Sequence, residues 1–203
     1  VRPAIGSDNR IGSAFLFPGI GYGGSCFPKD VAAIRKMGLD AGYSLRVLDS
    51  VDTVNKDQKR ILVDRVIARF GQDLTGRRFA VWGLSFKPKT DDMREAPSLT
   101  IIEALLARGA KVAAHDPEAM KEALRHFGDK VVFCNTPEDA TKGADALLLL
   151  TEWAVYRQPD FQLLKGALKQ AVVFDGRNVY DPAKMQELGF EYTGIGRGRK
   201  AST

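Results

Sequence analysis

From about residue 75 onward, short apolar runs alternate with helical patterns, and this alternation limits the possible folds more than any other feature of the chain. Five apolar runs predict buried strands: residues 79–84, 111–115, 131–133, 146–150 and 172–175. Four stretches between them have the period of helices: residues 98–107, 117–127, 137–142 and 161–168. Because helices separate consecutive strands, the strands are expected to run parallel, with helices on both faces. Residues 74–203 are therefore predicted to form an α/β domain with a doubly wound, mostly parallel, Rossmann-like sheet, which binds ligands beyond the carboxyl ends of its strands.

Residues 1–73 are predicted to be mainly helical. Pro28 suits the first turn of a helix, and apolar side chains follow it at helical spacing as far as Gly38. A longer amphipathic helix is predicted from Ser44, as its N-cap, to Phe70. The apolar stripe of this long helix needs a surface to cover, either within the chain or on a second subunit. The amino-terminal part is thus predicted to be a separate helical region.

The composition narrows the class of protein. With 44% hydrophobic and 27% charged residues among 203, the chain is expected to be globular rather than disordered. Its formal charge of +5 is a mild excess, so no binding to nucleic acid is expected. The longest apolar run, residues 146–150, is far shorter than the roughly 20 residues of a membrane-spanning helix, and no basic-then-apolar leader opens the chain. No membrane partner is expected, and the predicted location is the cytoplasm.

The segment from Gly19 to Gly24 matches the pattern G-x-G-x-x-G, which in isolation is a weak sign of dinucleotide binding. Its context argues against that interpretation, because Pro18 cuts the apolar run before it and Pro28 follows soon after. The glycines are better explained by a backbone that passes very close to a bound molecule and offers amide donors to it. A sugar or a phosphate is the kind of ligand that such a loop suits.

The two cysteines, Cys26 and Cys134, do not have the spacing of a metal site or a redox pair, so no metal is expected. Cys134 follows the apolar run 131–133 and is predicted to be a packing residue. Cys26 stands between the glycine-rich segment and a predicted helix start, where the helix N-terminus and nearby Lys29 favour the thiolate. Cys26 is therefore predicted to be a nucleophile. Asp30, in the first turn of the same helix, lies within reach of whatever Cys26 attacks.

Three motifs resemble, in the expected order, signatures of the UDP-glucose 6-dehydrogenase family of NAD-dependent nucleotide-sugar dehydrogenases. Residues 21–30 (GYGGSCFPKD) resemble the catalytic cysteine motif, and a match over ten consecutive residues is specific. Residues 86–95 (FKPKTDDMRE) resemble the second signature, and residues 174–178 (FDGRN) the third. The resemblance spans essentially the whole chain. It implies that residues 74–203 are the UDP-sugar-binding domain and that residues 1–73 hold the cysteine loop and part of the central dimerisation region.

The resemblance implies oxidation of the C6 hydroxyl of UDP-glucose to the carboxylate of UDP-glucuronate, with two molecules of NAD. Cys26 would add to an aldehyde to form a thiohemiacetal, and oxidation would give a thioester that water hydrolyses. Asp30 would orient or deprotonate that water. Substrate binding is implied for Arg10, Phe15, Leu16, Tyr22, Gly23, Gly24, Ser25, Phe86, Lys87 and Arg177. Cofactor binding is implied for Lys29 and Arg94.

In this family the dinucleotide fingerprint and a catalytic lysine lie upstream of the segment that these 203 residues resemble. The chain is therefore expected to be the carboxyl-terminal portion of a longer enzyme, without its main NAD-binding domain, and to be inactive alone. The resemblance also implies a homodimer through the predicted helix at residues 44–70. In that dimer Arg10 would reach the active site of the neighbouring subunit.

Three other functions stay open. The first is oxidation of GDP-mannose or of an N-acetylated UDP-sugar, although the segments around Arg177 and Gly194 look more like the members that act on UDP-glucose. The second is a catalytically silent module that binds a nucleotide sugar or joins subunits. The third is a redox-sensing thiol protein, which the lack of a resolving cysteine near Cys26 disfavours.

Overall fold

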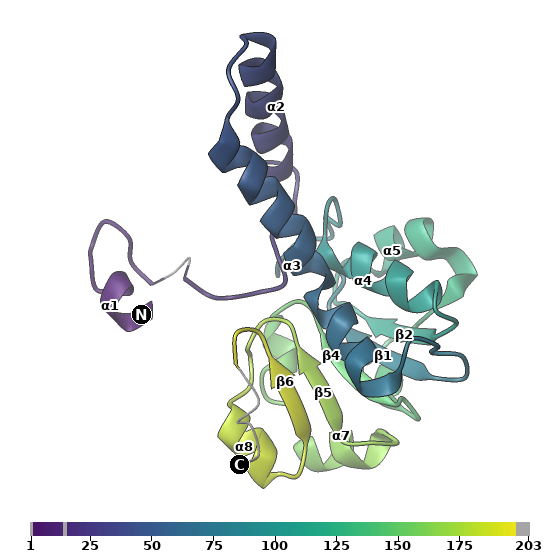
Figure 1. Ribbon diagram of the computed structural model, residues 1–203. Coiled ribbons are helices and arrows are strands. Elements are labelled where there is room, and N and C mark those ends of the chain that lie inside the picture. The colour runs from purple at the N-terminus through teal and green to yellow at the C-terminus, as the bar shows by residue number, and fades with distance from the viewer. Residues whose placement is uncertain (1, 14–15, 198–203) are drawn as a thin grey trace.

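The computed structural model describes residues 2–13 and 16–197 (Figure 1). Three helices precede the sheet: α1 (Arg2–Gly6), α2 (Phe27–Asp40) and α3 (Arg46–Phe70). The strands are β1 (Arg78–Trp82), β2 (Lys111–His115), β3 (Val131–Phe133), β4 (Ala146–Leu149), β5 (Val172–Asp175) and β6 (Glu191–Gly194). The helices among them are α4 (Pro97–Leu106), α5 (Met120–Phe127), α6 (Pro137–Thr141), α7 (Phe161–Ala167) and α8 (Pro182–Glu187), with short 3-10 helices η1 (Gly128–Lys130) and η2 (Ala154–Tyr156).

The strands form one six-stranded sheet in the order β3-β2-β1-β4-β5-β6, and each neighbouring pair is parallel. This confirms the predicted doubly wound parallel sheet. The direction of winding reverses between β1 and β4, so the crevice for ligands is expected where these two central strands end. The sequence prediction missed β6, because this short edge strand (EYTG) contains no apolar run.

Each face of the sheet has its own core, because alternate residues of a strand point to opposite faces. In β1, Phe79 and Val81 pack in the core that includes residues of α3, α4 and α5. Ala80 and Trp82 pack in the core that includes residues of α6, α7 and α8. The carboxyl-terminal half of α3 enters the first core through side chains such as the fully buried Leu62. The sheet therefore fixes one end of α3.

The other half of α3 and the whole of α2 project away from the sheet as a helical pair (Figure 1). α2 has no buried residue. Arg35 joins the two helices, since its guanidinium donates to Asp49 at 2.6 Å and to Asp52 at 2.9 Å. Apolar side chains such as Met37 and Val47 remain exposed on the pair. The sheet thus covers the predicted apolar stripe of α3 only in its carboxyl-terminal half.

One predicted helix start is wrong. Leu45, not Ser44, is the N-cap residue of α3, and no side chain caps this end by a hydrogen bond. The Leu45 side chain packs against Gly38 near the end of α2, so α3 begins at an apolar contact between the two helices. The other predicted helices and strands differ at their ends by three residues or fewer, the largest shift being α5, which begins at Met120.

Two kinds of feature are absent from the part of the chain that the structure describes. No helix there combines the length and the apolar character needed to cross a membrane. In the same residues, no three side chains of His, Cys, Asp or Glu gather in a group able to hold a metal ion. The polar groups that form the candidate site lie instead at the carboxyl edge of the sheet and on the loops beside it.

At the opposite edge, Asp145 connects the starts of two strands. Its side chain is 5% exposed, and it accepts hydrogen bonds from the Arg78 backbone N–H and the Arg77 side chain. Burial alone would raise the pKa of Asp145, but these hydrogen bonds, with the charges of Lys169 and Arg77, hold the pKa below its usual value. A carboxyl group of this kind stabilises the fold above about pH 4 and loses that effect as the pH falls through its folded-state pKa.

We therefore expect Asp145→Asn to lower the free energy of unfolding by about 2 kcal/mol at pH 7. As the pH falls from about 4 toward 2, the unchanged chain also becomes neutral at this position, so the difference should shrink. Urea denaturation across this pH range measures the effect, with Asp64→Asn on the exposed surface of α3 as the control. A difference that does not depend on pH would contradict the role given to Asp145.

Candidate active site

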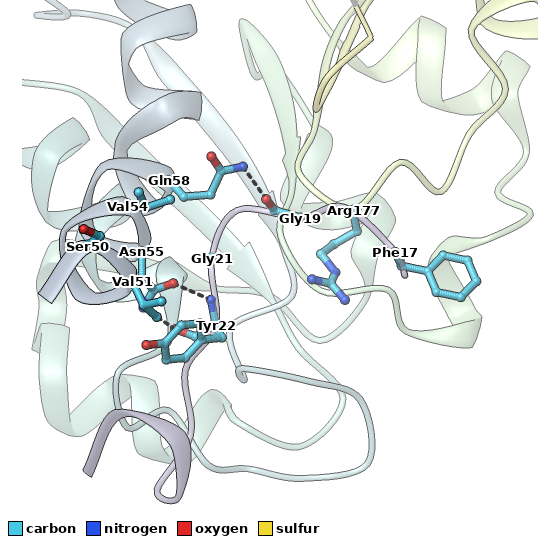
Figure 2. Close-up of a pocket in the computed structure, with 10 residues that line it drawn as sticks. All are labelled: Phe17, Gly19, Gly21, Tyr22, Ser50, Val51, Val54, Asn55, Gln58 and Arg177. Carbon is cyan, nitrogen blue, oxygen red and sulfur yellow. Dashed lines mark hydrogen bonds between the residues drawn. The ribbon is translucent and has the colours of Figure 1, made fainter. Parts of the chain in front are cut away.

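The glycine-rich loop lies between α3 and the carboxyl edge of the sheet. Ile20 is fully buried, and its side chain packs against Gly176, just after β5. Gly19 lies against the guanidinium of Arg177, so that a side chain at this glycine would collide with it. On the other side, Gln58 of α3 donates to the Gly19 carbonyl at 2.6 Å (Figure 2). The loop is therefore in contact with the sheet domain and with α3 at the same point.

The same loop packs against the segment that carries the second predicted motif. The Gly24 N–H donates to the Arg94 carbonyl at 2.7 Å. A Cβ on Gly24 would lie 2.8 Å from the Phe86 ring, and one on Gly23 would lie 2.8 Å from the Glu95 carbonyl carbon. Only glycine allows so close an approach at these two positions. The fold thus brings the cysteine motif and the 86–95 motif into direct contact.

Cys26 lies at the N-cap position of α2, and its thiol is free and exposed. Its backbone carbonyl accepts the N–H of Asp30 at 2.8 Å, which is the first hydrogen bond of the helix. The Ser25 hydroxyl lies 3.7 Å from the Cys26 sulfur. Pro28 occupies the first turn, where its missing N–H costs nothing. The sulfur is therefore open to a reagent and close to the positive end of the α2 dipole.

A cleft of about 390 Å³ opens beside Cys26, and its lining is Gly24, Ser25, Pro28, Lys29, Arg94 and Glu95. Arg94 donates to the Asp92 carboxylate at 2.9 and 2.8 Å. These hydrogen bonds and the charge of Asp92 raise the pKa of Arg94, and the negative charge of a Cys26 thiolate adds to the effect. The Lys29 ammonium lies 3.6 Å from Asp30. The cleft thus places two cations near the thiol, each with an acidic partner.

A second cavity, of about 530 Å³, lies between the glycine loop and α3 (Figure 2), and its lining is Phe17, Gly19, Gly21, Tyr22, Ser50, Val51, Val54, Asn55, Gln58 and Arg177. Arg177 donates to the Glu152 carboxylate at 2.7 and 2.8 Å, and both side chains are partly buried. Two parallel hydrogen bonds fix the plane of the guanidinium. Two of the predicted substrate residues, Tyr22 and Arg177, therefore line one cavity.

Phe86 and Lys87 lie on the loop that follows β1. The fully buried Asp116 carboxylate accepts the backbone N–H groups of Leu84 at 2.7 Å and Ser85 at 3.2 Å, which fixes the start of this loop. Phe86 is half-buried, and Lys87 is exposed, with its ammonium 5.2 Å from the centre of the Phe86 ring. The loop thus presents a cation at the rim of the site, next to an aromatic ring that contacts the glycine loop.

Two predicted substrate residues that the structure describes, Arg10 and Leu16, are not brought to this site. Arg10 is exposed and pairs with Asp8 at 2.6 Å, and the helix α1 just before it lies away from α2 and the sheet (Figure 1). Leu16 is half-buried and lies beside Gly6. Phe15 lies outside the described residues. Of the predicted substrate residues that the structure describes, one chain therefore brings those from Tyr22 onward to the site.

Sequence reasoning missed the polar residues of α3 that contact this site. Asn55 exchanges two hydrogen bonds with the backbone of Tyr22. Lys59, whose side chain is 8% exposed, pairs with Glu95 at 2.8 Å. A signal was available, because Asn55 and Lys59 continue, at helical spacing, the stripe that contains the buried Leu62. Polar residues in such a stripe indicate buried polar partners.

Known proteins are similar to this chain in sequence and in fold. The UDP-binding domain model of the UDP-glucose/GDP-mannose dehydrogenase family matches residues 80–182, and the central-domain model of the same family matches residues 1–57. The UDP-glucose 6-dehydrogenase of Pseudomonas aeruginosa is 48% identical over 204 residues, which cover 98% of this chain and 45% of that protein. The structure of a UDP-glucose dehydrogenase from the hyperthermophilic archaeon Pyrobaculum islandicum superposes with a TM-score of 0.80 at 35% identity, over 94% of this chain and 41% of that one.

A second solved structure is similar in fold. The NDP-N-acetyl-D-galactosaminuronic acid dehydrogenase of Methanosarcina mazei superposes with a TM-score of 0.79 at 28% identity, over 97% of this chain and 43% of that one. The chain spans less than half the length of each of these three relatives. The two family models together cover the cysteine loop, α2 and most of the sheet. The chain belongs to the UDP-glucose/GDP-mannose dehydrogenase family.

Proposed function

We propose that this chain is the carboxyl-terminal part of an NAD-dependent UDP-glucose 6-dehydrogenase, which oxidises UDP-glucose to UDP-glucuronate. The observation that carries the proposal is the exposed Cys26 thiol at the start of α2, where the glycine loop meets residues 86–95. Family membership and the relatives' names support it. Because the Pseudomonas relative is about twice as long, we assign the activity to a longer chain, which we call the full-length enzyme.

We further propose that residues 1–73 contribute the cysteine loop and the central helical region, and that residues 74–203 bind the nucleotide sugar. The chemistry of the carboxyl edge supports this division. Phe86 offers an aromatic ring, Lys87 an exposed cation and Arg177 a guanidinium of fixed orientation to a ligand that carries two phosphates and a sugar. The glycine loop borders the cavity that Arg177 also lines, through Gly19, Gly21 and Tyr22, so we assign this part of the loop to the glucosyl group.

The cleft beside Cys26 suits the anionic part of a dinucleotide. Its two cations, Lys29 and Arg94, have the donors that pyrophosphate oxygens require, so we assign both residues to NAD. When bound, NAD accepts the hydride that leaves C6 in each of the two oxidations. The main NAD-binding domain is assigned to the remainder of the full-length enzyme.

Cys26 supplies the nucleophile in this proposal. Its thiolate adds to the C6 aldehyde carbon, and the former carbonyl oxygen takes a proton to give a thiohemiacetal. Loss of the C6 hydride and of the hydroxyl proton leaves a thioester. Asp30, in the first turn of α2, accepts a proton from the water that attacks the thioester carbon. The carbon–sulfur bond then breaks, which releases the carboxylic acid and returns the sulfur to Cys26 as a thiolate.

We also propose a homodimer through α2 and α3. The projecting pair exposes large apolar side chains: Ile34, Met37, Leu39, Tyr43, Val47, Val51 and Val54. Apolar surface of this extent is more stable when buried, and a second copy of the same chain offers a matching face. Arg10, which lies away from the site of its own chain, is then assigned to the site of the neighbouring subunit.

The similarity to the Methanosarcina enzyme, with its TM-score of 0.79, makes an N-acetylated nucleotide sugar the second candidate substrate. Comparison of kcat/KM between the sugars distinguishes the two candidate substrates. We expect the full-length enzyme to oxidise UDP-glucose with a kcat/KM at least about tenfold above that for GDP-mannose or an N-acetylated UDP-sugar. The opposite preference would assign the site to the other sugar while leaving the role of Cys26 intact.

The amount of NADH formed tests whether the main NAD-binding domain lies outside the 203-residue chain. We expect two NADH per UDP-glucose from the full-length enzyme and none from the 203-residue chain, because the main dinucleotide domain is assigned to the remainder. The 203-residue chain should still bind UDP, which calorimetry measures. Arg177→Ala should weaken that binding, whereas Arg125→Ala, on the exposed surface of α5, should not. Turnover by the 203-residue chain, or a single NADH per sugar, would overturn this assignment.

A further inference from the structure

One side chain of α3 forms hydrogen bonds with both backbone groups of Tyr22. Asn55, which is 8% exposed, accepts the Tyr22 N–H at 2.8 Å through Oδ1 and donates to the Tyr22 carbonyl at 3.1 Å through Nδ2 (Figure 2). A carboxamide offers an acceptor and a donor side by side, as the backbone of a neighbouring strand does. Asn55 therefore takes the place of a strand partner for this part of the glycine loop.

The surroundings of Asn55 point to a specific role. Asparagine is a weak helix former, and burying its amide costs free energy unless both ends are bonded. The loop also approaches closely: Gly21 has a φ of +93°, and a Cβ there would lie 2.8 Å from Asn55 Oδ1. On the same helical face, Gln58 donates to the loop and Lys59 pairs with the segment that the loop packs against. This face of α3 is therefore complementary to the loop.

The path from Tyr22 to Cys26 is short and is fixed at two points. Tyr22 is bonded to Asn55, and Gly24 is bonded to the Arg94 carbonyl at 2.7 Å. The next residues lead directly into α2, which has no buried residue that could fix its own start. Arg35 also joins α2 to α3, but it lies further along the helix, so the two bonded points are the contacts that act most directly on the start of α2 and on the place of the thiol.

We propose that Asn55 is a positioning residue for Cys26. By bonding both backbone groups of Tyr22, it holds the glycine loop on α3 and so sets the place of the thiol at the start of α2. This inference rests on the proposed function and adds a residue to that site. We assign Asn55 an effect through the loop rather than on the reacting atoms, because both ends of its amide bond the backbone of Tyr22.

The first test uses the 203-residue chain without substrate. In Asn55→Ala we expect hydrogen exchange of the Tyr22 amide to accelerate at least about tenfold, because its acceptor is lost. The rate of Cys26 alkylation by iodoacetamide should change at least about threefold, because the start of α2, which carries the thiol, would move relative to the segment that contains Arg94. Cys134, read in the same mass spectrum, should react as before. Asp57→Ala, an exposed change in the same helix, is the matched control. Unchanged exchange at Tyr22, or unchanged alkylation of Cys26, would overturn the proposal.

The second test measures kcat of the full-length enzyme. We expect Asn55→Ala and Asn55→Asp each to lower kcat at least about tenfold, with melting temperatures within a few degrees of that of Asp57→Ala. Asn55→Asp keeps the size of the side chain but sets an acceptor against the Tyr22 carbonyl, so a role in packing alone would leave its kcat near normal. Normal kcat in either variant would overturn the inference. Acid formation by Cys26→Ser would instead overturn the proposed function and leave the exchange and alkylation results standing.

Discussion

Cys26→Ser is expected to lower the rate of UDP-glucuronate formation by the full-length enzyme at least about a thousandfold. The free, exposed thiol lies at the positive end of α2 and next to the cationic cleft, where a reagent can reach it. A serine hydroxyl in the same place stays protonated near neutral pH and is a much weaker nucleophile. Without the carbon–sulfur bond, neither the thiohemiacetal nor the thioester forms, so the second oxidation loses its intermediate.

Mass spectrometry of the products gives the rate of acid formation directly. Cys134→Ser is the matched control, because Cys134 follows the edge strand β3, lies outside the motif at residues 21–30, and has a thiol pKa that burial raises. We expect this control to keep its rate within about twofold, as is usual for a change away from the site. Acid production by Cys26→Ser at the rate of the unchanged enzyme would remove Cys26 from the chemistry.

Gly23→Ala is expected to lower kcat of the full-length enzyme at least about a hundredfold. The added Cβ would lie 2.8 Å from the Glu95 carbonyl carbon, and closer still to the carbonyl oxygen. These are backbone atoms, which cannot rotate aside as the end of a side chain can. The loop would have to move away from this segment and break the hydrogen bond from Gly24 to Arg94. Since Cys26 follows almost at once, the thiol would move with the loop.

Steady-state kinetics and thermal melting together test this prediction. The sheet should be preserved in Gly23→Ala, because its two cores contain no residue between 21 and 24. Gly166→Ala in α7 is the matched control: its φ is not in the left-handed region, and no other heavy atom lies within 4 Å of the added Cβ. We expect normal turnover from this control. Normal turnover from Gly23→Ala would mean that the loop can shift without displacing the thiol.

The sheet could be predicted from the sequence because its central strands are buried on both faces. Runs such as residues 79–84 and 146–150 are therefore continuously apolar, and the helices between them leave parallel pairing as the expected arrangement. β6 could not be found in this way, since an edge strand at Glu191–Gly194 is only partly buried and needs no apolar run. The start of α3 was also missed, because the contact between Leu45 and Gly38 depends on how two helices pack.

The site was less predictable than the fold. The motif at residues 21–30 is continuous, so its resemblance to a known family could be recognised from the sequence alone. Its contact with Arg94 joins residues far apart in the chain and leaves no local pattern. The same is true of the ion pair between Arg177 and Glu152, which only the ends of β4 and β5 bring together. Asn55 is an intermediate case. Its position in the buried stripe of α3 indicates a buried polar partner, but the sequence does not identify that partner.

The contacts of the glycine loop also determine the order in which the site can assemble during synthesis. Ribosomes make the amino-terminal end first, at roughly 5–20 residues per second, so Cys26 is translated well before the partners that surround its loop. Arg94 and Glu95 follow only after α3, and Gly176 and Arg177 emerge near the end of the chain. The loop, and the thiol that follows it, can therefore take their final places only several seconds after Cys26 is translated, once the segments that contact the loop have been made.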